Sequence, residues 1–193
     1  GNYQAARTRL EEALALSPEL GDMRGMGFAL AGLGEVALRQ GDYARATRLV
    51  EQSLDLRRQM GYKWGVGVSL GTLGWIAMRQ GDRDRAITCL RESLQIRKEI
   101  GDKSGSAWCL ERLAEMAMEQ GQAEKAARVF GAASALRAST GSVVDPIDQP
   151  ESERELAALR AQLGDERFGA AWDEGRSLTL NQAVEDAFGF SLQ

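Results

Sequence analysis

The sequence contains no histidine, and this absence excludes several kinds of site at once. A catalytic triad, a general base and a metal centre that depend on imidazole are all ruled out. The only two cysteines, Cys89 and Cys109, form no close metal-type pair and indicate reduced, buried thiols rather than a disulfide framework. We therefore expect a chain with no metal, no cofactor and no enzymatic activity.

Long apolar runs and blocks of one charge are also missing. No run approaches the roughly 18 apolar residues that a membrane helix needs, and nothing resembles a signal peptide. The net charge is −4, and acidic and basic residues are interleaved without a basic block. We therefore expect a cytoplasmic chain that contacts neither a membrane nor nucleic acid.

Glycine, by contrast, recurs at a fixed interval. From Gly1 to Gly141 a glycine stands at every twentieth position, and Asp, Asn or Ser usually follows it. Glycine adopts a positive φ cheaply and so closes a helix, while Asp or Asn accepts a hydrogen bond from the first free N–H groups of the next helix. The pattern predicts an all-α chain with helices over 2–20, 22–40, 42–60, 62–80, 82–100, 102–120 and 122–140.

Alternate helices carry different patterns, so the true period is 40 residues. The second helix of each unit aligns Ala6, Ala46, Ala86 and Ala126, and four residues later Leu10, Val50, Leu90 and Phe130. The first helix aligns Leu30, Leu70 and Leu110, and then Gly34, Gly74 and Ala114. Small residues at fixed points let helix pairs approach closely, and large residues fill the holes between them.

One unit shows the whole pattern in order: Leu30, Leu33, Gly34, Ala37, Gly41, Tyr43, Ala46, Val50 and Ser53. This order resembles the tetratricopeptide repeat, in its long-helix class of roughly 40 residues, over 1–140. The resemblance implies a superhelical solenoid of antiparallel helix pairs. It divides the array into a half unit, 1–20, and full units 21–60, 61–100 and 101–140. Since the chain starts inside a helical pattern without methionine, we expect a fragment whose array continues upstream.

The period fails in the C-terminal region, 141–193, which we interpret as a loop followed by capping helices. The stretch 141–151 contains Pro146 and Pro150 and reads as an extended loop. Three shorter helices are predicted, opened by Ser152-x-x-Glu155, by Asp165 and by Thr179-x-x-Gln182. A solenoid needs a terminal unit whose outer face tolerates water, and a separate binding activity is the alternative role for these helices.

A second resemblance covers about twenty residues of this tail. The residues are Phe168, Ala171, Trp172, Gly175, Arg176, Leu180, Ala183, Val184 and Ala187. They are similar to the end of large bacterial signalling regulators built from an effector domain, a nucleotide-binding switch domain and a helical repeat tail. The resemblance implies the sensor or interaction tail of a transcriptional or signalling regulator, with a protein, a peptide or a small-molecule inducer as its partner. The alternative is a free-standing scaffold for protein complex assembly.

In tetratricopeptide arrays the first helices line the concave surface, which implies a binding site here. The matching positions are Phe28, Ala31, Glu35 and Arg39, then Val68, Gly71, Trp75 and Arg79, then Trp108, Glu111, Glu115 and Glu119. Aromatic and charged side chains in a groove suit capture of a peptide or small ligand, and this groove is expected to run from cationic to acidic. The alternative is that Trp75 and Trp108 fill core gaps and the charges are merely solvated.

Three further sets of residues carry structural interpretations. Gly25, Gly65 and Gly105 recur one turn into each first helix, which favours close approach to the preceding helix. Arg57, Arg97 and Arg137 recur near second-helix ends, where cations suit the helix dipole. The stripe of Ala6, Leu10, Ala13 and Leu14 lacks a covering helix, so we expect self-association through the N-terminal helix.

Overall fold

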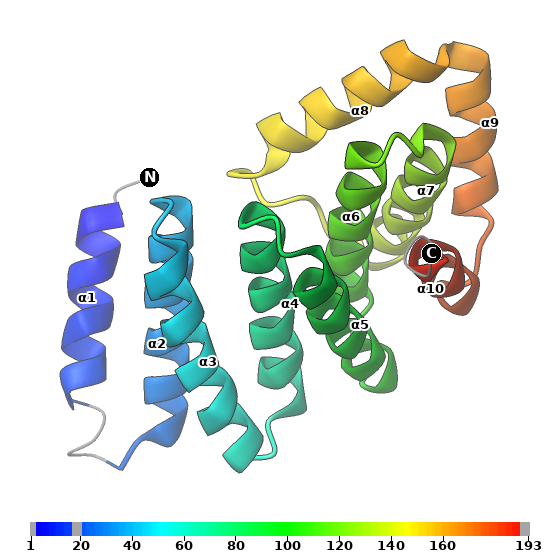
Figure 1. Ribbon diagram of the computed structural model, residues 1–193. Coiled ribbons are helices and arrows are strands. Elements are labelled where there is room, and N and C mark those ends of the chain that lie inside the picture. Colours follow the sequence, from blue (N-terminus) through cyan, green and yellow to red (C-terminus); the bar gives the residue numbers. More distant parts are fainter. Residues whose placement is uncertain (1–2, 17–20, 190–193) are drawn as a thin grey trace. The chain divides into compact units, whose positions relative to one another are not determined.

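The computed structural model describes residues 3–16 and 21–189, and all regular secondary structure in these ranges is α-helical (Figure 1). The helices are α1 (Tyr3–Leu16), α2 (Met23–Arg39), α3 (Tyr43–Gln59), α4 (Lys63–Arg79), α5 (Arg83–Glu99), α6 (Lys103–Glu119), α7 (Ala123–Thr140), α8 (Gln149–Leu163), α9 (Asp165–Arg176) and α10 (Leu180–Phe188). The predicted all-α class is confirmed. The end of the first predicted helix, 17–20, lies outside the described residues.

The chain forms two compact units, Gly1–Ile96 and Arg97–Gln193, and each is described by itself. In the first unit, α1 packs on α2, α2 on α3 and α3 on α4. In the second unit, α6 packs on α7, and α7 is also contacted by α8, α9 and α10. Successive antiparallel helix pairs therefore stack as expected for a tetratricopeptide-like fold, whereas the exact repeat and cap boundaries remain a prediction.

The glycine period sets the helix ends, as the sequence predicted. All seven turn glycines from Gly21 to Gly141 have φ between 64° and 78°. The following aspartates cap the next helix: Asp22 accepts from the Gly25 amide at 2.8 Å and Asp42 from the Arg45 amide at 3.0 Å. Tyr62 stands at an equivalent position without a side-chain cap. Local hydrogen bonding thus places each turn without help from distant residues.

Small residues allow the two helices of one tetratricopeptide-like repeat to cross at close range. A Cβ built on Gly34 would lie 2.5 Å from Val50 Cγ2, and one on Gly74 would lie 2.8 Å from Leu90 Cγ. Ala46 and Ala86 are fully buried at the same crossings, with 0% exposure. The aligned glycines and alanines are therefore the contact points of the helix pairs.

The tail follows the prediction less closely at its start. α8 begins at Gln149 with Asp148 at its N-cap, so the predicted opening at Ser152 is wrong and the loop is shorter than expected. Proline is tolerated in the first helical turn because its missing N–H would be unpaired there anyway, and Pro150 occupies that place. The predicted capping box at Thr179 is confirmed: the backbone N–H of Gln182 donates to Thr179 Oγ1 at 3.3 Å.

α9 and α10 cover α7, the last helix of the repeat pattern. At Gly131 on α7 and Gly175 on α9, an added Cβ would collide with backbone atoms of the opposite helix, namely those of Trp172 and Arg128. Arg128 also donates through Nε to Asp186 Oδ2 on α10 at 2.8 Å. The tail is thus fastened to α7 by close backbone packing and by an ion pair.

Candidate binding surface

Eight of the twelve predicted lining residues lie on α2 and α4, within the first compact unit, Gly1–Ile96. Phe28 is 43% exposed, and Glu35 and Arg79 are also exposed. Ala31, Arg39 and Val68 are half-buried, while Gly71 is buried. Three of these eight residues are thus accessible, and the others are partly or fully buried.

Trp75 lies beneath Arg39 rather than open to solvent. The indole is only 6% exposed, and the Arg39 guanidinium carbon lies 4.8 Å from the centroid of its ring. Arg39 Nη2 also lies 3.6 Å from Glu35 Oε1 on the same helix. The burial of Trp75 favours the alternative in which this side chain fills the core, and a partner would meet Arg39 first.

A more exposed aromatic cluster lies beside Phe28 and was missed by sequence reasoning. The Tyr62 ring centroid lies 6.3 Å from that of Phe28 and 5.9 Å from that of Trp64, and Trp64 is 43% exposed. The Arg24 guanidinium carbon lies 5.5 Å from the Tyr62 centroid. We call Arg24, Phe28, Tyr62 and Trp64 the aromatic patch. Its sequence signal was Tyr62 at a position where the repeat otherwise favours aspartate.

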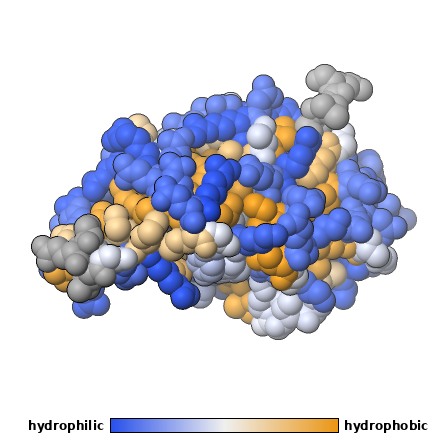
Figure 2. Space-filling model, turned by 90° about the horizontal axis from the view of Figure 1, so that it is seen from below, coloured by the Kyte–Doolittle hydropathy of each residue, from blue (hydrophilic) through white to orange (hydrophobic). Residues whose placement is uncertain are grey.

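Exposed large hydrophobic side chains are few among the described residues, which makes the aromatic patch notable. They are Leu16, Met23, Phe28, Trp64, Ile100, Val143 and Ile147. On the face shown in Figure 2, hydrophilic residues predominate and hydrophobic surface appears between them. Single exposed apolar residues are ordinary, whereas neighbouring aromatics beside an arginine are typical of binding surfaces.

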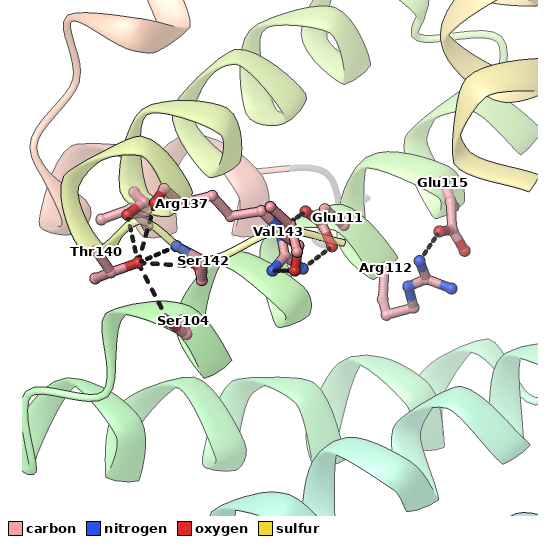
Figure 3. Close-up of polar contacts among 9 residues, drawn as sticks. Ser104, Glu111, Arg112, Glu115, Arg137, Thr140, Ser142 and Val143 are labelled. Carbon is pink, nitrogen blue, oxygen red and sulfur yellow. Dashed lines mark hydrogen bonds and ion pairs between the residues drawn. The ribbon is translucent and has the colours of Figure 1, made fainter. Parts of the chain in front are cut away.

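The other four predicted lining residues lie on α6 in the second unit, where most of the charge is already paired (Figure 3). Glu111 binds Arg137 through two hydrogen bonds, with Nε–Oε1 at 2.6 Å and Nη2–Oε2 at 2.7 Å. Glu115 Oε1 lies 2.7 Å from Arg112 Nη2. The Arg112 guanidinium carbon in turn lies 5.5 Å from the centroid of half-buried Trp108.

Glu115 is also unusual in its protonation. Desolvation by burial raises the pKa of this carboxyl from 4.5 to about 8, outweighing the opposite effect of Arg112. The carboxylates of Glu155 and Glu151 on α8, and of Glu111, raise the pKa further by repulsion. The carboxylates of α8 therefore lie close enough to the predicted binding face of α6 to add negative charge to it.

The expected change from a cationic to an acidic groove loses its support in the second unit. Glu111 is 6% exposed and neutralised by Arg137, and Glu115 is paired with Arg112 and favours its neutral form near pH 7. Glu119 is the exposed carboxylate among the three. Sequence spacing could not show this, because Arg137 lies 26 residues from Glu111.

The recurring arginines have a structural role beyond the expected helix-dipole effect. Arg57 is 2% exposed, and its Nη1 donates to Gly65 O at 3.0 Å and to Ser69 Oγ at 2.9 Å. Desolvation lowers the pKa of Arg57 from its ordinary value. A Cβ at Gly65 would lie 2.8 Å from Arg57 Cδ. The glycine one turn into the helix thus makes room for an arginine of the preceding helix.

The same pairing recurs in the second unit. Arg97 is 6% exposed and donates to Asp102 Oδ2 at 2.5 Å. A Cβ added to Gly105 would overlap the Arg97 guanidinium. The predicted close approach is therefore correct at Gly65 and Gly105, and at both a buried arginine is a group that approaches.

Groups that could support other chemistry are sparse in the described part of the chain. Cys109 is fully buried, and burial raises the pKa of the half-buried Cys89 thiol. Residues 3–16 and 21–189 contain no cluster of three or more His, Cys, Asp or Glu side chains able to hold a metal ion. Within those residues, no helix has the length and apolarity needed to cross a membrane.

Fold and sequence together define a tetratricopeptide repeat protein. The family model described as "Tetratricopeptide repeat" matches residues 1–59 and 66–139, and the chain belongs to this family. It is therefore a repeat module of the kind that mediates protein interactions, and its match to the family spans both units.

Part of this chain is similar to part of several much longer proteins. Proteins of Mycobacterium bovis and Mycobacterium tuberculosis whose names describe them as HTH-type transcriptional regulators are 40% identical to this chain over 57 residues. The match covers 30% of this chain and 6% of each relative. The chain thus corresponds to a small part of those proteins.

Proposed function

We propose that this chain is a non-catalytic binding module that acts in the cytoplasm as the sensor or interaction tail of a bacterial transcriptional or signalling regulator. The partial similarity to proteins named as HTH-type regulators supports this context. The tail residues from Phe168 to Ala187, which resemble the end of large bacterial signalling regulators, agree with this context. In this proposal the effector domain lies outside the chain and the repeats supply the regulatory contact.

The first-helix surface of the first unit is the proposed contact site, and the aromatic patch carries the argument. Phe28 and Trp64 are each 43% exposed, and Arg24 lies against Phe28 and Tyr62. Aromatic and arginine side chains contribute most of the energy in protein interfaces because they bury large, rigid areas. A peptide or protein segment with an apolar anchor fits this surface, with Arg39 and Glu35 orienting its polar groups.

The test is a paired substitution in the full regulator. We expect Phe28→Ala with Trp64→Ala to weaken partner binding or the transcriptional response at least about tenfold, because two exposed anchors are lost. The matched control is Val143→Ala with Ile147→Ala, which removes two exposed apolar side chains elsewhere and should leave the response unchanged. A normal response from the folded Phe28/Trp64 variant would reject the aromatic patch as the site.

Whether the chain is part of a regulator is tested separately, by sequencing the complete reading frame that encodes it. A regulator requires effector and nucleotide-binding segments in the same reading frame. A reading frame holding tetratricopeptide repeats alone would instead identify a free-standing scaffold, and the regulator proposal would be wrong even if the aromatic patch binds a partner.

A further inference from the structure

The helices α8 and α9 enclose a groove in the second unit that the repeat pattern does not include. α8 and α9 meet at an angle (Figure 1), and the groove lined by residues of both helices has a volume of about 970 Å³. Half-buried Leu156 and Trp172 supply most of its apolar surface, and the ring of Phe168, which is 6% exposed, lies beneath them and stacks on Trp172 with centroids 5.5 Å apart. Its size is at the upper end of the range typical of ligand and peptide sites.

Small residues on both helices make this groove accessible to another backbone. Ala157 and Ala161 lie one turn apart on α8 and are exposed, and Gly169 faces the groove from α9. Glycine inside a helix costs up to about 1 kcal/mol relative to alanine. Gly175 on the same helix is explained by its contact with α7, whereas a Cβ at Gly169 would meet no atom within 4 Å.

The edge of the groove is negatively charged. Glu153, Asp165 and Asp173 line it, against a single lining cation, Arg160. Arg160 Nε lies 3.5 Å from Asp165 Oδ1, and its guanidinium carbon lies 4.9 Å from the Phe168 centroid. Three carboxylates against one guanidinium leave an acidic edge around an apolar floor, which complements a helix whose apolar face is flanked by lysine or arginine.

We propose that the α8–α9 groove is a docking site for a basic amphipathic helix of a partner protein. The aromatic floor takes the apolar side chains, Gly169 and the alanines admit the helix backbone, and the acidic edge pairs with the flanking cations. The tail then has a binding function in addition to covering α7. This site is separate from the aromatic patch, so either one can fail without the other.

The probe is a labelled helical peptide of about 18 residues with leucine on one face and lysine on the other. Fluorescence anisotropy with the full 193-residue chain should show saturable binding that weakens with added salt. A peptide with the same leucine face and glutamate in place of lysine should bind at least about tenfold more weakly. Absence of binding by the lysine peptide, or equal binding of the two peptides, would overturn the proposal.

Two leucine substitutions on α9 locate the binding. Gly169→Leu fills the groove while improving helix propensity, and it should weaken lysine-peptide binding at least about tenfold without lowering the melting temperature. Ala170→Leu is the control, since Ala170 is exposed on the same helix and does not line the groove. Unchanged affinity in Gly169→Leu would reject the groove. A dimer of the free chain that Gly169→Leu abolishes would assign the groove to a second copy instead.

Discussion

At the scale of single residues, the buried charged side chains are stabilised by hydrogen-bond partners that are buried or half-buried with them. Arg57 and Arg97 are nearly inaccessible, and each is satisfied by acceptors on the next helix or at its cap. Burying an arginine without partners would cost several kcal/mol, so the glycines that make room for it are part of the same structural device. Glu115 is the case in which burial changes the protonation state instead.

The raised pKa of Glu115 predicts a pH-dependent stability. Between pH 4.5 and about 8 the folded chain holds a proton that the unfolded chain releases, so stability falls as pH rises through this window. The slope is up to about 1.4 kcal/mol per pH unit. Glu115→Gln keeps the neutral form, and urea unfolding at several pH values should show this decline removed.

Glu119→Gln is the control for that measurement. It removes an exposed carboxylate from the end of the same helix, and the pH-dependent decline should persist. Parallel stability profiles for the native chain and the Glu115→Gln variant would show that Glu115 is ionised in the folded state at neutral pH.

At the scale of the helices, glycine turns and capping residues fix where each repeat helix begins and ends. Each turn glycine takes a left-handed φ that other residues adopt at a cost, and the next residue usually caps the following helix. Helical glycines fall into a different group, because most of them admit a neighbouring side chain or backbone. Turn glycines thus supply a left-handed backbone and most helical glycines supply space, whereas Gly169, with no atom within 4 Å of an added Cβ, does neither.

Alanine substitutions should distinguish a turn glycine from a helical glycine that has open space around it. Gly41→Ala, at φ 78°, should destabilise the chain by about 1–2 kcal/mol, since Cβ clashes in the left-handed region. Gly169→Ala, in a helix with open space around the added Cβ, should stabilise by up to about 1 kcal/mol. Denaturant midpoints measure both, and shifts of the same sign would contradict the assignment.

At the scale of the whole molecule, the N-terminal helix differs from its repeat equivalents in what covers it. Ala46, Ala86 and Ala126 are completely buried, with 0% exposure. The equivalent Ala6 is exposed, as is Ala13, while Leu10 is half-buried. Ala6 and Ala13, at positions that the repeat pattern uses for packing, are thus open to solvent on α1.

We expect this stripe to mediate self-association of the chain, because exposed apolar surfaces tend to be covered. Analytical ultracentrifugation should show concentration-dependent association, and Ala6→Glu should abolish it by placing a charge on the stripe. Thr8→Glu adds the same charge on another side of α1 and should leave association intact. A monomer at every concentration would contradict this prediction.

Sequence alone determined the helices and their pairing, because the signals are local. Glycine and the capping residue act on backbone groups within about four positions, and the 3.6-residue period places apolar residues on one face. The misplaced start of α8 shows the limit of such signals, since both Asp148 and Ser152 are suitable caps and Pro150 fits the first turn.

The surface chemistry was decided by tertiary structure alone. The depth of Trp75, the pairing of Glu111 with Arg137 and the pairing of Arg128 with Asp186 involve other helices, with sequence separations of 26 and 58 residues for the two ion pairs. The α8–α9 groove likewise depends on the angle at which two helices meet. Burial and charge pairing arise from three-dimensional neighbours, so a repeat period predicts which positions face inward but not which of them stay open to a partner.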